Sequence, residues 1–304
     1  MKTKITTTLL LFLTAMIWGL AFVAQVDGVE HIGSFAINGI RYPIGVISLL
    51  PVVLFFERGR VDGAERKRTV IASIVAGTIL FGASTLQQIG IEYTRSAGVA
   101  GFITGLYTVL VPIGCFLIFK HKTGINVWIG AILAVIGLFL LCYRVGDGFS
   151  FGVGELLLLL GSFLWTAHVI VIDRLGKNIR SLHFALGQFS VCSVLSIVLM
   201  LIFDRPTISG VMDAKWALLY CGVLSVGVAY TLQVVAQKKA DPTFAAIILS
   251  TESVFSAIGG SIFGIDSISW LGYIGCAVMF CGIVISQLPT RKQIKQNDSE
   301  TQKE

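Results

Sequence analysis

Ten apolar stretches of about twenty residues fill this chain of 304 residues, and they constrain its fold more than any other feature. An α-helix rises about 1.5 Å per residue, so roughly 20 apolar residues cross a hydrocarbon core of about 30 Å. Because 55% of the residues are hydrophobic and only 13% are charged, little sequence remains for a water-soluble domain. We therefore expect an all-α polytopic membrane protein with ten transmembrane helices, near residues 5–26, 34–56, 69–91, 96–118, 126–143, 153–172, 183–203, 214–236, 243–264 and 268–287.

Lys and Arg are concentrated in alternate loops between these stretches. With the N-terminus placed in the cytoplasm, most of the 23 basic residues flank the cytoplasmic ends of the spans. Short cytoplasmic loops carry such an excess, so we expect a multi-pass protein of the cell (inner or plasma) membrane with both termini in the cytoplasm. The net charge of +6 follows from the same bias, which indicates contact with the lipid bilayer and no nucleic-acid partner. The exceptions are Arg95, Arg144, Arg205 and Lys215 at the opposite ends, and Arg41 within a span.

The two halves of the chain resemble each other. Residues 15–20 resemble residues 162–167 at an offset of 147, and this offset places Arg41 over Gln188. The pattern predicts one five-helix repeat at 1–145, a second at 146–289 and a disordered cytoplasmic tail at 290–304. Since five is odd, the second repeat starts on the opposite side of the membrane, so the two are inverted repeats. Folds of this kind bind their substrate near the midplane, where the halves meet.

Several of these features together resemble a known family. They are a Trp in spans one and six, an Arg eight residues into span two, and a W-x-G start with a later Gly in the closing helix of a half; the segments Thr104-Gly105-Leu106-Tyr107-Thr108-Val109 and Ser250-Thr251-Glu252-Ser253-Val254-Phe255 complete the set. In this order, duplicated and inverted, they resemble the EamA-type drug/metabolite transporter superfamily over nearly the whole chain. The resemblance implies transport of amino acids, related metabolites or amphipathic drugs, commonly outward.

Ionisable residues inside spans are costly, by at least about 2.5–3.5 kcal/mol at a helix centre, so each needs a reason. Arg41 could hold a substrate carboxylate or phosphate; the alternatives are an inter-helix pair, a gating role or a side chain that reaches the outer interface. Glu252 lies near the middle of span nine. It could bind and release a coupling proton, bind a substrate ammonium group, or form a static ion pair with Arg41.

Other polar and aromatic side chains lie at similar depth. His168, on nearly the same helix face as Trp165, could line a pocket or be a neutral hydrogen-bonded histidine. The rings of Trp18, Trp165, Tyr107 and Tyr230 could line a cavity or fill the core. Gln88, Gln188 and Gln233 add amides at similar depth; Gln88 and Gln188 are candidate substrate ligands, and all three could instead join helices by hydrogen bonds. No carboxylate or Cys stands at ligand spacing from His168, so we expect no metal site and no cofactor apart from a coupling proton.

Small residues recur every four positions in spans four and nine. Ala97, Gly101 and Gly105 form one stripe, and Ser253, Ala257 and Ser261 form the other. Such stripes allow helices to approach closely. We expect these two spans to cross at the centre of the bundle.

The sequence lacks the motifs of a nucleotide-driven pump, and no catalytic residues are identified, so we expect no enzymatic activity. The favoured function is a secondary active transporter with alternating access that exports small metabolites. The alternatives are an importer or exchanger, a passive channel or scramblase, and an intramembrane enzyme. The sequence does not predict the oligomeric state.

Overall fold

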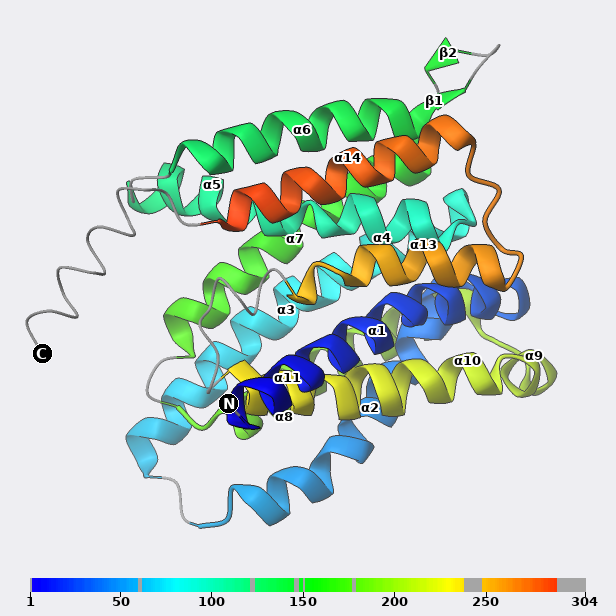
Figure 1. Cartoon of the computed structure of the whole chain (residues 1–304). Helices are drawn as coiled ribbons and strands as arrows, with labels where there is room; N and C mark the ends of the chain where they lie inside the picture. The colour runs from blue at the N-terminus through cyan, green and yellow to red at the C-terminus, as the bar shows by residue number, and fades with distance from the viewer. Residues whose placement is uncertain are drawn as a thin grey trace, which may run out of the picture.

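The structure is a computed structural model of the chain that describes residues 2–59, 62–120, 124–144, 148–149, 151–176, 179–237 and 248–288. Within these residues it is a helical bundle, and its only strands are two of two residues each, at one end of the bundle (Figure 1). The helices are α1 (Lys2–His31), α2 (Ser34–Phe56), α3 (Gly63–Thr94), α4 (Ala97–Gly105), α5 (Tyr107–Phe119), α6 (Ile125–Cys142), α7 (Val153–Leu175), α8 (Ser181–Leu199), α9 (Ile208–Asp213), α10 (Lys215–Leu219), α11 (Tyr230–Gln237), α13 (Glu252–Ile262) and α14 (Trp270–Gln287), with π-helical η1 (Met200–Asp204) and η2 (Tyr220–Ala229) and strands β1 (Tyr143–Arg144) and β2 (Gly148–Phe149).

Eight helical stretches of the described residues are long and apolar enough to cross a membrane, and Trp270–Ser286 is a shorter apolar helix. They agree with nine of the ten expected spans, mostly within a few residues at each end. The third differs most, because it begins at Gly63 instead of residue 69. There the Asp62 side chain accepts a hydrogen bond from the Glu65 amide at 2.6 Å and caps the helix. The expected ninth span begins within residues 238–247, outside the described part, as does the expected tail at 290–304.

The helices pack in pairs that join the two halves of the chain. Helix α6 lies beside α14 along one edge of the bundle in Figure 1, while α2 packs on α8 and α4 on α13. Helix α3 packs on α7, and α1 packs on η2 and α11 in the same way. The α6–α14 contact is a close backbone approach, because a Cβ on Gly137 would lie 2.6 Å from the Gly275 carbonyl oxygen.

The expected crossing of spans four and nine is present in the structure. Ser253 Oγ donates a hydrogen bond to the Gly101 carbonyl at 3.1 Å, and a Cβ on Gly101 would overlap the Ser256 side chain. The stripe in span nine is only partly as expected. Ser261 is exposed and bonds the Tyr273 hydroxyl at 2.5 Å, because the contact with α4 follows the line through Ser253 and Ala257 and ends before Ser261.

Carboxylates join α2 and α8 at both ends of their contact. Glu57, directly after α2, accepts hydrogen bonds from the backbone amides of Leu182 and His183, both at 3.0 Å. At the opposite end, Asp204 accepts from the Ala36 amide at 2.7 Å. The offset of 147 residues relates Glu57 to Asp204 and Ala36 to His183, so the two contacts are equivalent. Each satisfies amides at a helix start that have no partner within the helix.

The fourth span is interrupted near its middle, and so is the described part of the ninth. Leu106 separates α4 from α5, where Thr108 Oγ1 donates to the Gly105 carbonyl at 2.8 Å. Before α13, Thr251 Oγ1 donates to the Ile248 carbonyl at 2.6 Å. Hydroxyls that bond nearby carbonyls in this way compete with the regular helix ladder. As a result, Tyr107 begins α5 and Glu252 begins α13.

Candidate functional site

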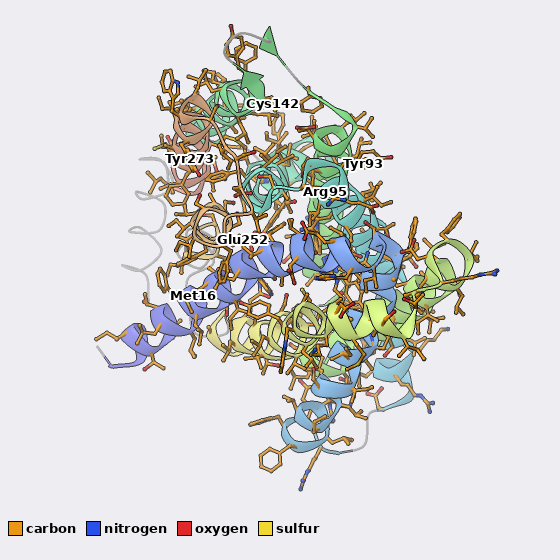
Figure 2. The ribbon with its side chains drawn as sticks, turned by 90° about the vertical axis from the view of Figure 1, so that its right-hand side faces the viewer. Met16, Tyr93, Arg95, Cys142, Glu252 and Tyr273 are labelled. Carbon is orange, nitrogen blue, oxygen red and sulfur yellow. The ribbon has the colours of Figure 1, made fainter. Side chains whose placement is uncertain are left out.

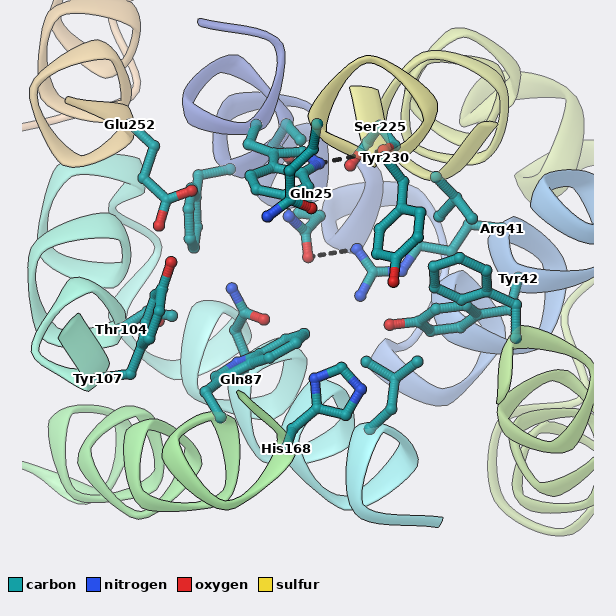
Figure 3. Close-up of a pocket in the computed structure, with 18 of the residues that line it drawn as sticks. Gln25, Arg41, Tyr42, Gln87, Thr104, Tyr107, His168, Ser225, Tyr230 and Glu252 are labelled. Carbon is teal, nitrogen blue, oxygen red and sulfur yellow. Dashed lines mark hydrogen bonds between the residues drawn. The ribbon is translucent and has the colours of Figure 1, made fainter. Parts of the chain in front are cut away.

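A cavity of about 210 Å³ lies between the two halves of the bundle (Figure 3). All the described spans contribute residues to its wall, except those formed by α6 and α14. The lining residues are Trp18, Ala21, Phe22, Gln25, Arg41, Tyr42, Leu80, Gln87, Thr104, Tyr107, Trp165, His168, Val169, Ile172, Phe189, Ser225, Val226, Tyr230, Gln233 and Glu252.

Most of the site residues predicted from the sequence lie on this wall. Gln88 and Gln188 do not. Gln188 bonds two lining side chains from behind, whereas Gln88 is fully buried and its amide nitrogen and oxygen have no hydrogen-bond partner among the described residues. The predicted site residues that line the cavity are Trp18, Arg41, Tyr107, Trp165, His168, Tyr230 and Glu252.

Equivalent faces of α1 and α7 form two opposing parts of the wall. Helix α1 contributes positions 18, 21, 22 and 25, and α7 contributes positions 165, 168, 169 and 172. Both sets follow the spacing of one helix face, and the offset of 147 superimposes them. Trp18 Nε1 donates to the Ser225 carbonyl at 3.1 Å, which fixes its ring against η2.

Arg41 reaches the cavity from α2 and is only 6% exposed. Its Nη1 donates to Gln25 Oε1 at 2.5 Å, and its guanidinium carbon lies 5.0 Å from the centre of the Tyr42 ring. Its Nε is buried and has no hydrogen-bond partner among the described residues. The side chain therefore does not extend to the membrane interface, which was one of the alternatives; it points into the cavity (Figure 3).

Glu252 and Tyr107 occupy the opposite side of the cavity, at the two helix interruptions. Glu252 is 6% exposed, and the Tyr107 hydroxyl faces its carboxyl as a side-chain hydrogen-bond partner. Seen from the end of the bundle that carries Arg95, Glu252 lies inside, close to α1 (Figure 2). Glu252 also stands in the first turn of α13, where the helix dipole stabilises negative charge. Among the described residues it makes no ion pair with Arg41, because Tyr107 and Gln25 are the partners of the two groups.

His168, Gln188 and Tyr230 form a hydrogen-bonded chain at a third side of the cavity. His168 Nε2 lies 2.9 Å from Gln188 Oε1, and Gln188 Nε2 donates to the Tyr230 hydroxyl oxygen at 3.1 Å. With the amide in this orientation, His168 Nε2 is the donor, so a neutral ring keeps Nδ1 free as an acceptor. Both readings of His168 from the sequence therefore apply, because it is hydrogen-bonded and also lines the cavity.

The sequence analysis missed several polar lining residues, namely Gln25, Tyr42, Gln87 and Thr104. Two signals point to some of them. Gln25 lies seven residues after Trp18, which is two helical turns along the same face. Gln87 corresponds to Gln233 at an offset of 146, and both line the cavity. Thr104 begins one of the two segments on which the family resemblance rests, whereas Tyr42 shows no comparable signal.

Exposure differs between the two ends of the cavity. Gln25, Arg41 and Gln87, toward the end that holds His31, are buried. Ile172 and Gln233, toward the end that holds Leu175, are partly exposed. Within the described residues, the wall is thus more tightly closed at the His31 end.

The sequence model of the EamA-like transporter family matches this chain over residues 5–143 and again over residues 152–288. The chain belongs to the EamA-like transporter family. The resemblance noted in the sequence is therefore confirmed.

Relatives of the EamA-like chain include an uncharacterized transporter of Archaeoglobus fulgidus, 27% identical over 279 residues, which are 91% of this chain and 84% of the relative. The uncharacterized transporter YoaV of Bacillus subtilis is 23% identical over 279 residues, covering 89% of this chain and 93% of YoaV. One solved crystal structure covers 94% of this chain and 97% of its own, with a TM-score of 0.68 and 18% identity. At that identity the structure shows a shared fold. The family match and the apolar helices together show a multi-pass membrane protein whose relatives are transporters.

Proposed function

We propose that this EamA-like protein is a secondary active transporter that exports small metabolites by alternating access, with amino acids and amphipathic drugs as candidate substrates. The observation that carries the proposal is the cavity, because equivalent positions of the two halves line it near the middle of the helices. A cavity at the junction of two repeats is the usual substrate site of such transporters. The greater exposure at its Leu175 end fits a state open toward the cytoplasm.

Ten spans in two inverted five-helix repeats, 1–145 and 146–289, are part of this proposal. The helix contacts support it, since exchanging the two halves reproduces the pairs α2–α8, α4–α13 and α6–α14 and converts α3–α7 into the contact of α1 with η2 and α11. The equivalent carboxylate contacts of Glu57 and Asp204 support it as well. The basic loops favour a cell-membrane location with both termini in the cytoplasm.

Glu252 is proposed to couple transport to the movement of a proton. No cofactor is proposed. Burial favours its neutral form, whereas Tyr107 and the start of α13 favour its anion. A carboxyl under opposing influences of this kind suits a proton that is bound and released during the cycle. Arg41, on the other side of the cavity, is proposed to bind or gate the substrate.

Efflux from cells preloaded with a labelled amino-acid mixture tests the function. We expect faster loss of at least one species from cells that carry the protein than from cells that carry the Arg41→Ala, Glu252→Gln variant at equal expression. Unchanged loss would exclude amino-acid export, and dye, drug and nucleotide panels in both directions would then decide between the other substrates and the importer.

The coupling role has its own measurement. For the species that is exported, the rate should depend on the pH gradient in the wild type and lose that dependence in Glu252→Gln. The exposed Glu30→Gln variant, with a side chain 58% exposed, is the matched control and should behave as the wild type. An unchanged pH profile in Glu252→Gln would exclude proton coupling through this residue.

A further inference from the structure

Among the described residues, the cavity wall carries a positive charge on one side only. Arg41 supplies it, and the position equivalent to Arg41 in the second half is the neutral Gln188, which points its amide at His168 and Tyr230. Among the described residues, Arg41 interacts with the neutral Gln25 amide, the Tyr42 ring and the Cys221 thiol. No carboxylate of the described residues forms an ion pair with it. Within the described part of the chain, the guanidinium is thus buried without a counter-ion.

A buried charge without a partner is strongly unfavourable, most of all within a membrane. Arg41 retains donors for a partner, because a guanidinium carries five N–H bonds and its Nε has no acceptor among the described residues. Gln25 holds Nη1 and so orients the planar fork that binds carboxylate or phosphate through two parallel hydrogen bonds. The side chain is therefore oriented in advance for an anionic oxygen group.

The rest of the wall defines the other features of an occupant. Rings of Trp18, Phe22, Trp165 and Phe189 line the cavity and suit a flat apolar body. The volume of about 210 Å³ lies below the 300–1,000 Å³ that is common for ligand pockets, which favours a small molecule. Glu252 lies across the cavity from Arg41 and already has Tyr107 as a partner, so it does not neutralise Arg41.

We infer that the cavity binds a small organic anion, with its anionic oxygen group on Arg41 and an apolar or aromatic body among the four rings. This inference rests on the proposed transport function and names the substrate class of the same site. Gln25 acts as a positioning residue for the guanidinium.

Three probes share a phenyl group on a short chain and differ in charge. They are 3-phenylpropanoate, an anion, 3-phenylpropanamide, which is neutral, and 3-phenylpropylamine, a cation. Binding to the purified full-length protein in detergent is followed by quenching of tryptophan fluorescence, since Trp18 and Trp165 line the cavity. We expect the acid to bind at least about tenfold more tightly than the amide or the amine, as for loss of a charged hydrogen-bond partner. Equal binding of the three probes, preference for the amine, or no binding of the acid would overturn the inference.

Variants of Arg41 locate the effect. Arg41→Gln should lower the affinity for the acid at least about tenfold and remove the preference over the amide. The affinity of Arg41→Lys for the acid should lie between those of the wild type and Arg41→Gln, because an ammonium group keeps the charge but cannot form two parallel hydrogen bonds. Arg95→Gln makes the same substitution at a side chain that is 59% exposed outside the cavity, and it should bind as the wild type does. An unchanged preference in Arg41→Gln would also refute the assignment.

The efflux measurement separates the two levels of the argument. Export that depends on Arg41 of a species without a carboxylate, phosphate or other anionic oxygen group would refute the anion site and leave the transporter in place. If no labelled species is moved in either direction and no probe is bound, the transport function itself fails.

Discussion

At the residue scale, the bundle depends on small side chains where α4 crosses α13. A Cβ on Gly101 would lie 1.9 Å from Ser256 Oγ and 2.6 Å from Ser256 Cβ. The Cβ contact cannot be relieved by rotating the serine, so the two helix backbones would have to separate. The structure therefore requires glycine at position 101, whereas the stripe seen in the sequence required only a small residue there.

Gly101→Ala is therefore expected to destabilise the protein by about 1–3 kcal/mol, the usual cost of overpacking. Thermal unfolding of the purified protein in detergent measures the change. Gly63→Ala is the matched control, because a Cβ there has no atom within 4 Å, and it should unfold close to the wild-type temperature. Equal unfolding temperatures for the two variants would contradict the described crossing.

Residue-level reasoning from the sequence identified the charged and aromatic side chains of the site better than its amides. Arg41 and Glu252 were detectable because charge inside a span is costly wherever the side chain points. An amide gives no such signal. Gln87 lines the cavity while its neighbour Gln88 is buried elsewhere. Apart from the correspondence of Gln87 to Gln233, only the packing of α3 against other helices distinguishes the two.

At the element scale, the α2–α8 pair is joined at its ends by carboxylates bonded to helix starts. Burial alone would raise the pKa of Glu57, but the amides of Leu182 and His183 and the His183 ring outweigh it and lower the pKa below its usual range. The His183 Nδ1 lies 2.7 Å from Glu57 Oε2. The carboxylate therefore contributes to stability while it is ionised.

Glu57→Gln should lower the stability by about 1 kcal/mol near neutral pH, as for loss of a helix cap. The sign of the pH dependence follows from linkage. Since folding lowers the pKa of Glu57, its contribution is fully present above the pKa of the unfolded chain and is lost as the pH falls through the folded-state pKa. Unfolding temperatures of wild type and variant, measured from neutral to acidic pH, should converge at low pH. A constant difference would contradict this assignment.

Asp204→Ala tests whether the two ends are equivalent. It removes the acceptor of the Ala36 amide at the start of α2, and we expect a loss of similar size, about 1 kcal/mol, at neutral pH. A loss at one end only would show that the two contacts differ in strength despite their related positions.

At the scale of the whole molecule, the charge pattern predicts which end faces the cytoplasm. Arg95 and Arg205 are exposed, and Arg58 is exposed after α2 at the other end. With the N-terminus inside, Arg95→Cys and Arg205→Cys should react with a membrane-impermeant maleimide in intact cells, whereas Arg58→Cys should react only after permeabilisation. Labelling is compared with the unsubstituted protein, because Cys281 is exposed. The reverse pattern would invert the orientation.

The sequence by itself determined the features that depend on local composition. Helix rise and bilayer thickness set the length of an apolar span, so the spans could be placed before any contact was known. The duplicated Trp18 and Trp165 marked the two halves. Only the tertiary structure decided that α4 ends and α13 begins beside the cavity. It also decided that Glu57 caps a helix 125 residues away, and that Tyr107 rather than Arg41 faces Glu252. These contacts join helices that are distant in the chain, and hydropathy along one helix does not specify which neighbour its polar side chains will meet.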